Sequence, residues 1–227
     1  MVNRILGIGL TVLAVIVGAL AQGSTPALKT QKEKFSYSVG LDIGRNMVQR
    51  AEDIDADVLV RGIRDALSGA TPLLTDQQIE ETMKQYQAEM MEKQGVAAER
   101  NKKTGEAFLA ENKKKEGVVT LPSGLQYKIL KAGSGPKPTA GQSVECNYRG
   151  TLIDGKEFDS SYKRGQTITF PLTNVIKGWS EALQLMPVGS KWQLFVPSDL
   201  AYGDRGAGND IEPGATLIFE VELVSIK

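Results

Sequence analysis

The sequence contains no histidine, and its single cysteine is Cys146. The missing imidazole excludes histidine-based acid–base catalysis, histidine metal sites and Ser–His or Cys–His nucleophiles. One cysteine cannot form an internal disulfide, so disulfides do not stabilise the fold. Cys146 alternates with Val144 and Tyr148, which predicts a small buried apolar residue. An intermolecular disulfide is the alternative for an unpaired cysteine in an oxidising compartment.

Net charge is also absent, because 27 Lys and Arg residues balance 27 Asp and Glu residues. This balance gives no reason to expect nucleic acid or an anionic membrane as a partner. No metal-ligating constellation, phosphate-binding loop or activated nucleophile is recognisable, so neither a metal nor a cofactor is expected. At 227 residues the chain is long enough for two small domains.

Only the start of the chain has a long apolar run, from Ile5 to Leu20. It follows the basic residue Arg4 and ends in Ala19-Leu20-Ala21, a small-residue cleavage pattern. Residues 1–21 are therefore predicted to be a secretory signal peptide. An uncleaved anchor is the alternative, but the run is shorter than the ~20 residues that span a bilayer.

Residues 22–95 are predicted to form a helical dimerisation domain. Thr30 with Glu33 and Thr75 with Gln78 are capping boxes that begin helices, and Gly69 is placed to end another. Apolar residues recur at helical spacing: Phe35, Val39, Ile43 and Met47; Leu59, Ile63, Ala66 and Leu67; Ile79, Met83, Tyr86 and Met90. Three short helices share little core, so we expect a homodimer through them. A small three-helix core within one chain is the alternative.

Residues 96–117 are rich in Ala, Glu, Lys and Asn, which predicts a long, largely solvated connecting helix. Gly105 costs about 1 kcal/mol there relative to alanine and marks a place for a bend. Gly117 is expected to end the helix.

Residues 118–227 alternate between apolar and polar residues, with Glu and Arg on the second face. One-sided alternation predicts an antiparallel sheet with a single buried face. The apolar positions are Val144, Cys146, Tyr148, Ile168, Phe170, Trp192, Leu194, Val196, Leu217, Phe219, Val221 and Leu223. Trp179, Ala182, Leu183 and Met186 predict one short helix covering that face. The class is thus α+β, with a curved sheet around one helix and a pocket floored by the Trp179 indole.

Six motifs then carry a resemblance: NYRG at Tyr148, GKEFDSS at Phe158, VIKGW at Val175, LMPVG at Leu185, LAYG at Leu200 and ATLIFEV at Ala215. Their order and spacing over residues 121–227 resemble those of FKBP-type peptidyl-prolyl isomerases. YSVGLDIG and GEAFLAENKKKEGVVTLPSGLQYK are similar to the exported macrophage infectivity potentiator (Mip) group of that family. This resemblance implies dimerisation by the N-terminal helices and a location in the periplasm of a Gram-negative bacterium, with the outer membrane or cell surface as alternatives.

The resemblance also implies the chemistry: acceleration of X–Pro isomerisation in proline-containing polypeptides by non-covalent stabilisation of the twisted amide. Trp179 would be the floor under the proline ring, the Ile176 N–H and Tyr202 hydroxyl would bind carbonyls, and Asp159 would face the twisted amide or orient Tyr148. The implied catalytic residues are Tyr148, Phe158, Asp159 and Tyr202, and the implied substrate-binding residues are Val175, Ile176, Trp179, Ile168 and Phe219.

Some site residues have simpler explanations. Tyr148 and Phe219 would lie in the core of any such sheet, and Asp159 fits ordinary turn chemistry. The loop from Gly203 to Gly214 is charged where many family members are apolar, which bears on the binding of macrolide inhibitors. A dimeric chaperone or surface-binding protein, with isomerisation incidental, is the second hypothesis, because Met83, Met90 and Met91 offer adaptable apolar contacts.

Overall fold

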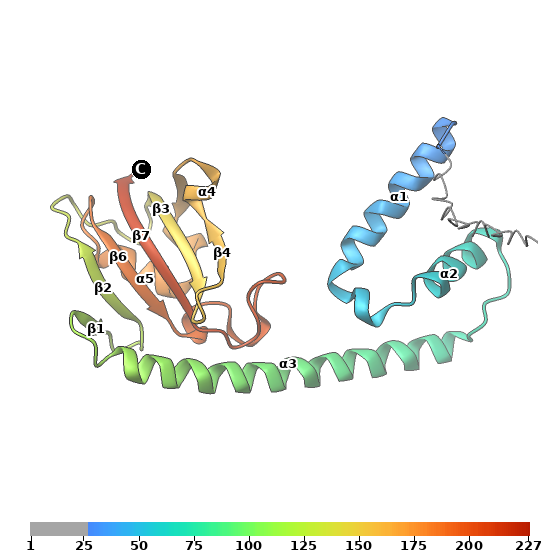
Figure 1. The fold of residues 1–227 in the computed structure, drawn as a ribbon, viewed down its shortest axis with the longest axis horizontal. Helices are drawn as coiled ribbons and strands as arrows, with labels where there is room; N and C mark the ends of the chain where they lie inside the picture. Colours follow the sequence, from blue (N-terminus) through green and yellow to red (C-terminus); the bar gives the residue numbers. More distant parts are fainter. Residues whose placement is uncertain (1–26) are drawn as a thin grey trace, which may run out of the picture. The chain divides into compact units, whose positions relative to one another are not determined.

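The computed structural model describes residues 27–227, so the predicted signal peptide lies outside the described residues. Within these residues the chain forms N-terminal helices, one long helix and a curved antiparallel sheet (Figure 1), which confirms the predicted α+β class. The chain divides into two compact units, one ending at Leu59 and the other beginning at Val60. Within residues 27–227, no helix combines the length and apolar character needed to cross a bilayer.

Helix α1 (Gln31–Met47) begins at the predicted capping box. The Glu33 amide donates to the Thr30 hydroxyl oxygen at 3.1 Å, and the Thr30 amide donates to the Glu33 carboxylate at 2.9 Å. A 3₁₀ turn, η1 (Val48–Asp53), leads on to α2 (Ala56–Ser68). Neither helix contains a buried residue, and large apolar side chains such as Phe35, at 67% exposure, remain uncovered.

Helix α3 (Asp76–Asn112) is one continuous element, where a third short helix and a separate connecting helix were predicted. Gly105 does not interrupt the helix, and the helix end predicted at Gly117 is wrong, because the helix ends at Asn112. The helix is also less solvated than predicted, because Ala98, Gly105 and Asn112 are buried along one face. Their spacing of two helical turns places them on the side that packs against the sheet region.

Gly105 lies in a helix because its missing side chain makes room for the sheet region. A Cβ built at Gly105 would be 3.0 Å from the Thr216 Cβ and closer still to the Thr216 hydroxyl. Further along α3, Phe108 contacts Phe195, with ring centroids 6.1 Å apart. The buried Asn112 donates to the Gln126 side-chain oxygen at 2.9 Å. The C-terminal part of α3 is thus joined to the sheet and runs along one end of it (Figure 1).

The sheet is antiparallel throughout, in the order β1-β2-β6-β7-β3-β4, with β5 paired to β3. Its strands are β1 (Val118–Thr120), β2 (Gln126–Lys131), β3 (Ser143–Leu152), β4 (Glu157–Ser160), β5 (Ile168–Pro171), β6 (Lys191–Val196) and β7 (Leu217–Ile226). The predicted alternation holds in the long central pair, since Val144, Cys146 and Tyr148 of β3 are all buried. Burial of Cys146 agrees with its prediction as an apolar core residue.

Helix α5 (Lys177–Leu185) covers the buried face of the sheet, as predicted, with Trp179, Ala182 and Leu183 turned into the core. A second, shorter helix, α4 (Ser161–Arg164), was not predicted. It is one turn long, begins at the cap residue Ser160 and ends at Gly165, which adopts a left-handed conformation (φ 71°). Three 3₁₀ turns complete the region: η2 (Leu172–Asn174), η3 (Ser198–Leu200) and η4 (Gly203–Arg205).

Candidate active site

A cavity of about 390 Å³ opens between α5 and the sheet. This volume is within the range of small-ligand sites, and it suits a proline and its neighbouring residues. The lining is mainly aromatic and aliphatic, with few polar groups: Tyr148, Phe158, Asp159, Phe170, Asn174, Val175, Ile176, Trp179, Tyr202 and Phe219. Eight of the nine predicted site residues are among them.

Trp179 is held rigidly at the base of this cavity. Three aromatic rings meet the indole nearly edge-on: Tyr148 at 5.1 Å and 86°, Phe219 at 5.3 Å and 80°, and Phe170 at 5.7 Å and 85°. Such edge-to-face pairs contribute about 0.5–1.5 kcal/mol each beyond burial. They come from β3, β5 and β7, so the curvature of the sheet itself fixes the indole plane. Trp179 is only 4% exposed, and its ring N–H has no acceptor among the described residues.

Two hydrogen-bond donors border the cavity. Ile176 precedes the first residue of α5, and its backbone N–H has no acceptor in the described part of the chain. The first amides of a helix lack intrahelical partners and favour negative charge, so this N–H can receive a carbonyl oxygen. Tyr202 precedes η4, and its side chain is 40% exposed. Burial and the nearby Asp159 carboxylate raise the pKa of Tyr202, so its hydroxyl stays protonated and can donate.

A polar network forms one wall. The Tyr148 hydroxyl donates to the Asp159 carboxylate at 2.5 Å, and the Arg164 guanidinium donates to the Tyr148 oxygen at 2.6 Å and to Asp159. Burial raises the pKa of Tyr148 to about 12, and acceptance by Asp159 acts in the same direction. Burial favours the neutral form of Asp159, but the bonds from Tyr148 and Arg164 outweigh it and lower the pKa of Asp159. The carboxylate is therefore ionised at neutral pH.

The arrangement can bind and orient a chain but offers no nucleophile paired with a base. Desolvation, directed hydrogen bonds and a shaped apolar floor are what it supplies. These are sufficient for a reaction that breaks no covalent bond.

Comparison with known proteins agrees with this chemistry. Residues 32–129 match the model of the domain amino-terminal to FKBP-type peptidyl-prolyl isomerase, and residues 135–224 match that of FKBP-type peptidyl-prolyl cis-trans isomerase itself. The outer membrane protein MIP of Legionella longbeachae is 49% identical over 213 residues, 92% of this chain and 91% of the relative. The chain belongs to the FKBP-type peptidyl-prolyl cis-trans isomerase family.

Other members of the family support the same assignment. The peptidyl-prolyl cis-trans isomerase Mip of Coxiella burnetii is 43% identical over 219 residues, 95% of each chain. The crystal structure of FkpA from Escherichia coli has a TM-score of 0.61 and 37% identity, and it covers 88% of this chain and 99% of that one. The match extends beyond the sheet to the N-terminal helices and the long helix.

Within this FKBP-type site the placement of Ile168 differs from the expectation. Ile168 of β5 packs against the core but does not line the cavity. Phe170, two residues further along the same strand face, lies against Trp179 instead. Asn174 also reaches the cavity and was not predicted. Phe170 could have been predicted, because the alternation that selects Ile168 selects Phe170 as well, and aromatic rings pair favourably with an indole.

Arg164 is a third residue of the site that was not predicted from the sequence. Its guanidinium lies 5.4 Å from the centre of the Tyr148 ring as well as bonding the hydroxyl. The sequence from Ser160 to Gly165 contains a helix cap and a helix-ending glycine. These two signals could have predicted a single helical turn that brings Arg164 back to Asp159.

Proposed function

We propose that this FKBP-type isomerase accelerates X–Pro exchange in exported polypeptides at the cavity above Trp179. The observation that carries the proposal is the indole contacted edge-on by three aromatic rings. In the same cavity wall, the donors of Ile176 and Tyr202 have no acceptor among residues 27–227. The proline ring would lie on the indole, and the two donors would bind the carbonyls that flank the proline.

The mechanism needs no covalent step. Rotation about a peptide bond faces a barrier of ~18–20 kcal/mol because amide resonance must be broken. X–Pro isomers are nearly equal in energy, yet they exchange only over tens to hundreds of seconds. An apolar cavity removes the water that stabilises the planar, charge-separated amide, and donors placed for the rotated carbonyl favour the twisted form.

Each polar residue has a proposed role in this step. The Ile176 N–H and the Tyr202 hydroxyl bind substrate carbonyls. Asp159 holds Tyr148 in place and presents its charge to the twisted amide, and Arg164 fixes both. Phe158, Val175 and Phe219 complete the apolar walls. Macrolide inhibitors of the family are proposed to compete for the same cavity.

We further propose that the protein is a homodimer formed through its N-terminal helices, within residues 22–95. Its proposed location is the bacterial periplasm or the outer membrane. Large exposed apolar side chains on α1 and on the first half of α3 support the dimer, among them Phe35, Leu41 and Met83. The printed name of the Legionella relative, an outer membrane protein, supports the location. After the proposed signal peptide, we propose three parts of the chain. They are a helical dimerisation part at residues 22–95, a connecting part at 96–117 and an isomerase part at 118–227.

The test is the exchange rate of a short X–Pro peptide, measured by NMR line-shape or exchange spectroscopy with wild type, Tyr202→Phe and Asp159→Ala. Circular dichroism confirms that each variant is folded. We expect acceleration by wild type and a loss of about tenfold or more in each variant, which is the usual scale for a transition-state hydrogen bond. Equal rates for wild type and folded variants would place the chemistry elsewhere.

A chaperone role is the second candidate, favoured by the exposure of Met83 at 60% and Met91 at 63% on α3. Methionine surfaces adapt to many apolar partners. The two roles separate in one assay: suppression of aggregation of an unfolded client that has no rate-limiting proline step. If Tyr202→Phe protects the client as well as wild type does, the helices act as a chaperone independently of the cavity.

A further inference from the structure

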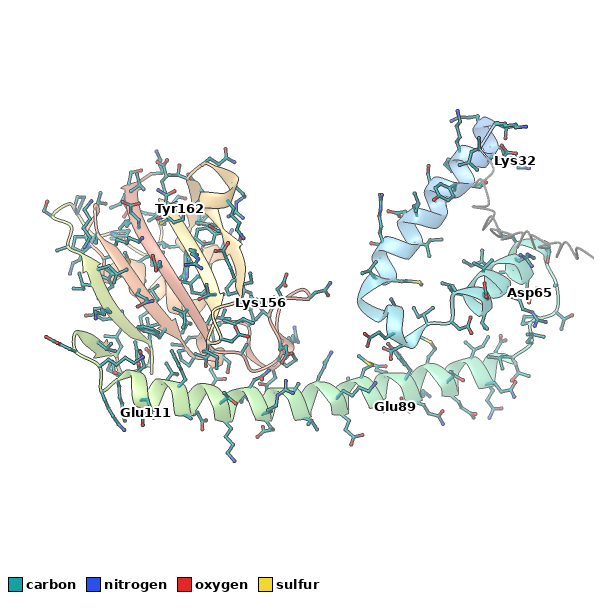
Figure 2. All side chains as sticks on the ribbon, in the orientation of Figure 1. Lys32, Asp65, Glu89, Glu111, Lys156 and Tyr162 are labelled. Carbon is teal, nitrogen blue, oxygen red and sulfur yellow. The ribbon has the colours of Figure 1, made fainter. Side chains whose placement is uncertain are left out.

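The loop that follows Tyr202, residues 203–214, is anchored at its acidic residues. Each of the three acids forms an ion pair with a base outside the loop: Asp204 with Lys102 at 2.7 Å, Glu212 with Arg100 at 2.7 Å, and Asp210 with Lys156 at 2.9 Å. The acidic residues that distinguish this loop from that of many family members are thus all paired with bases. Two of the three bases, Arg100 and Lys102, lie within one turn of α3. The third, Lys156, labelled in Figure 2, lies between β3 and β4 at the same end of the sheet.

Helix α3 holds both ends of the loop. At the far end, the Asn101 amide donates to the Glu212 carboxylate and to the Pro213 carbonyl, each at 2.9 Å. Gly214 packs directly on the helix backbone, since a Cβ built there would be 2.9 Å from the Ala98 Cα. At the near end, Lys102 pairs with Asp204.

The two ends also meet each other beside Tyr202. The Gly214 amide donates to the Gly203 carbonyl at 2.9 Å, which closes the loop immediately after Tyr202. A cavity of about 380 Å³ lies between the loop, α3 and the β3–β4 hairpin. Apart from Ile211, which is buried, and Gly214, the loop has no buried residue. Its position therefore depends largely on the polar contacts with α3 and Lys156.

We propose that Arg100, Asn101 and Lys102 of α3 are positioning residues for the isomerase, which hold the loop so that the Tyr202 hydroxyl meets the substrate carbonyl. The proposal rests on the proposed substrate contact of Tyr202. A loop already held in place loses less conformational entropy when substrate binds. In a released loop this entropy is lost when substrate binds, before the amide twists, so the cost is the same for the bound and the twisted states. The effect therefore falls mainly on KM, while kcat changes little.

The test compares two variants of the full-length chain. The first, called the loop-release variant, is Arg100→Ala/Asn101→Ala/Lys102→Ala. The control is Lys103→Ala/Lys113→Ala, which removes the same number of positive charges from one exposed position on α3 and one directly after it, neither of which makes a side-chain contact with the loop. We expect the loop-release variant to raise KM about fivefold, with kcat within about twofold of wild type, on the scale of a few exposed ion pairs and hydrogen bonds.

Hydrogen exchange gives a readout of the loop itself. Amides of residues 203–214 are expected to exchange faster in the loop-release variant and at the wild-type rate in the control. Faster exchange with an unchanged KM would overturn the proposal, because the loop would then be loosened without effect on the site. Unchanged exchange would overturn it as well.

Tyr202→Phe separates this proposal from the one on which it rests. If α3 acts through Tyr202, combining Tyr202→Phe with the loop-release variant adds little to the loss caused by Tyr202→Phe alone. If the two losses multiply in full, α3 acts by another route and the proposal fails. If Tyr202→Phe alone is as active as wild type, the assigned role of Tyr202 fails first. Lys102→Asp alone should raise KM. Combining it with Asp204→Lys, which exchanges the two charges, should reverse part of that increase.

Discussion

At Gly105, α3 packs closely on Thr216 of the isomerase region, and replacing the glycine with alanine tests that contact. In an exposed helix, Gly→Ala stabilises by about 1 kcal/mol, because glycine loses more backbone entropy on folding. At Gly105 the new methyl group would be 3.0 Å from the Thr216 Cβ and would overlap its hydroxyl. Thr216 is 5% exposed and β-branched, so it cannot rotate away freely. Overpacking of this kind costs about 1–3 kcal/mol.

Gly95 provides the matched control, since it lies on the same helix and a Cβ there meets nothing within 4 Å. The gain in helix propensity is common to both substitutions, so their difference isolates the packing cost. We expect Gly105→Ala to be about 1–3 kcal/mol less stable than Gly95→Ala, which is several degrees in Tm at about 2–4 °C per kcal/mol.

Unfolding in urea, followed by tryptophan fluorescence, measures this difference in the right part of the molecule. Both tryptophans, Trp179 and Trp192, lie in the isomerase region. If Gly105→Ala stabilises that region as much as Gly95→Ala does, the close packing of α3 on Thr216 is refuted.

Three further predictions concern titratable groups. Arg164→Gln should reduce kcat/KM by about three- to tenfold and raise the pKa of Asp159, seen by carboxyl NMR; an unchanged pKa would count against the network. Hydrogen bonds from Lys227, Thr167 and Ser225 lower the pKa of Glu145 to about 2. The contribution of Glu145 to folding stability is therefore complete above its unfolded pKa, near 4.5, and is lost as the pH falls towards 2. Glu145→Gln should thus be less stable than wild type at pH 7 and equal near pH 2, and a constant difference in unfolding free energy would contradict this. Burial raises the pKa of the Cys146 thiol to about 12, so thiol reagents at pH 8 should modify it only after unfolding; rapid labelling of folded protein would disprove its burial.

Much of the sheet could be predicted because its signal is local. Alternation placed Val144, Cys146 and Tyr148 on the buried face, and the spacing from Trp179 to Leu183 placed the covering helix. The family motifs then identified most of the cavity. Each of these features depends on residues close together in the chain.

Features that depend on distant contacts were missed. Gly105 suggests a bend when only helix propensity is considered, and its purpose is visible only once Thr216, more than a hundred residues later, is packed against it. The charged residues of the loop at 203–214 suggest a departure from the family until Arg100 and Lys102 are seen opposite them. Arg164 reaches Tyr148 only because an unpredicted single turn, α4, folds it back.

The two indole N–H signals offer the most direct test that substrate binds above Trp179. In one NMR sample, an X–Pro peptide is added while its cis/trans exchange and both indole signals are followed. Trp179 lines the cavity, whereas Trp192 does not. The Trp192 ring stacks on Tyr127, with ring centroids 4.3 Å apart. We predict accelerated exchange together with a saturable shift of the Trp179 signal and a nearly constant Trp192 signal. Accelerated exchange with an unmoved Trp179 signal at saturating peptide would contradict the account.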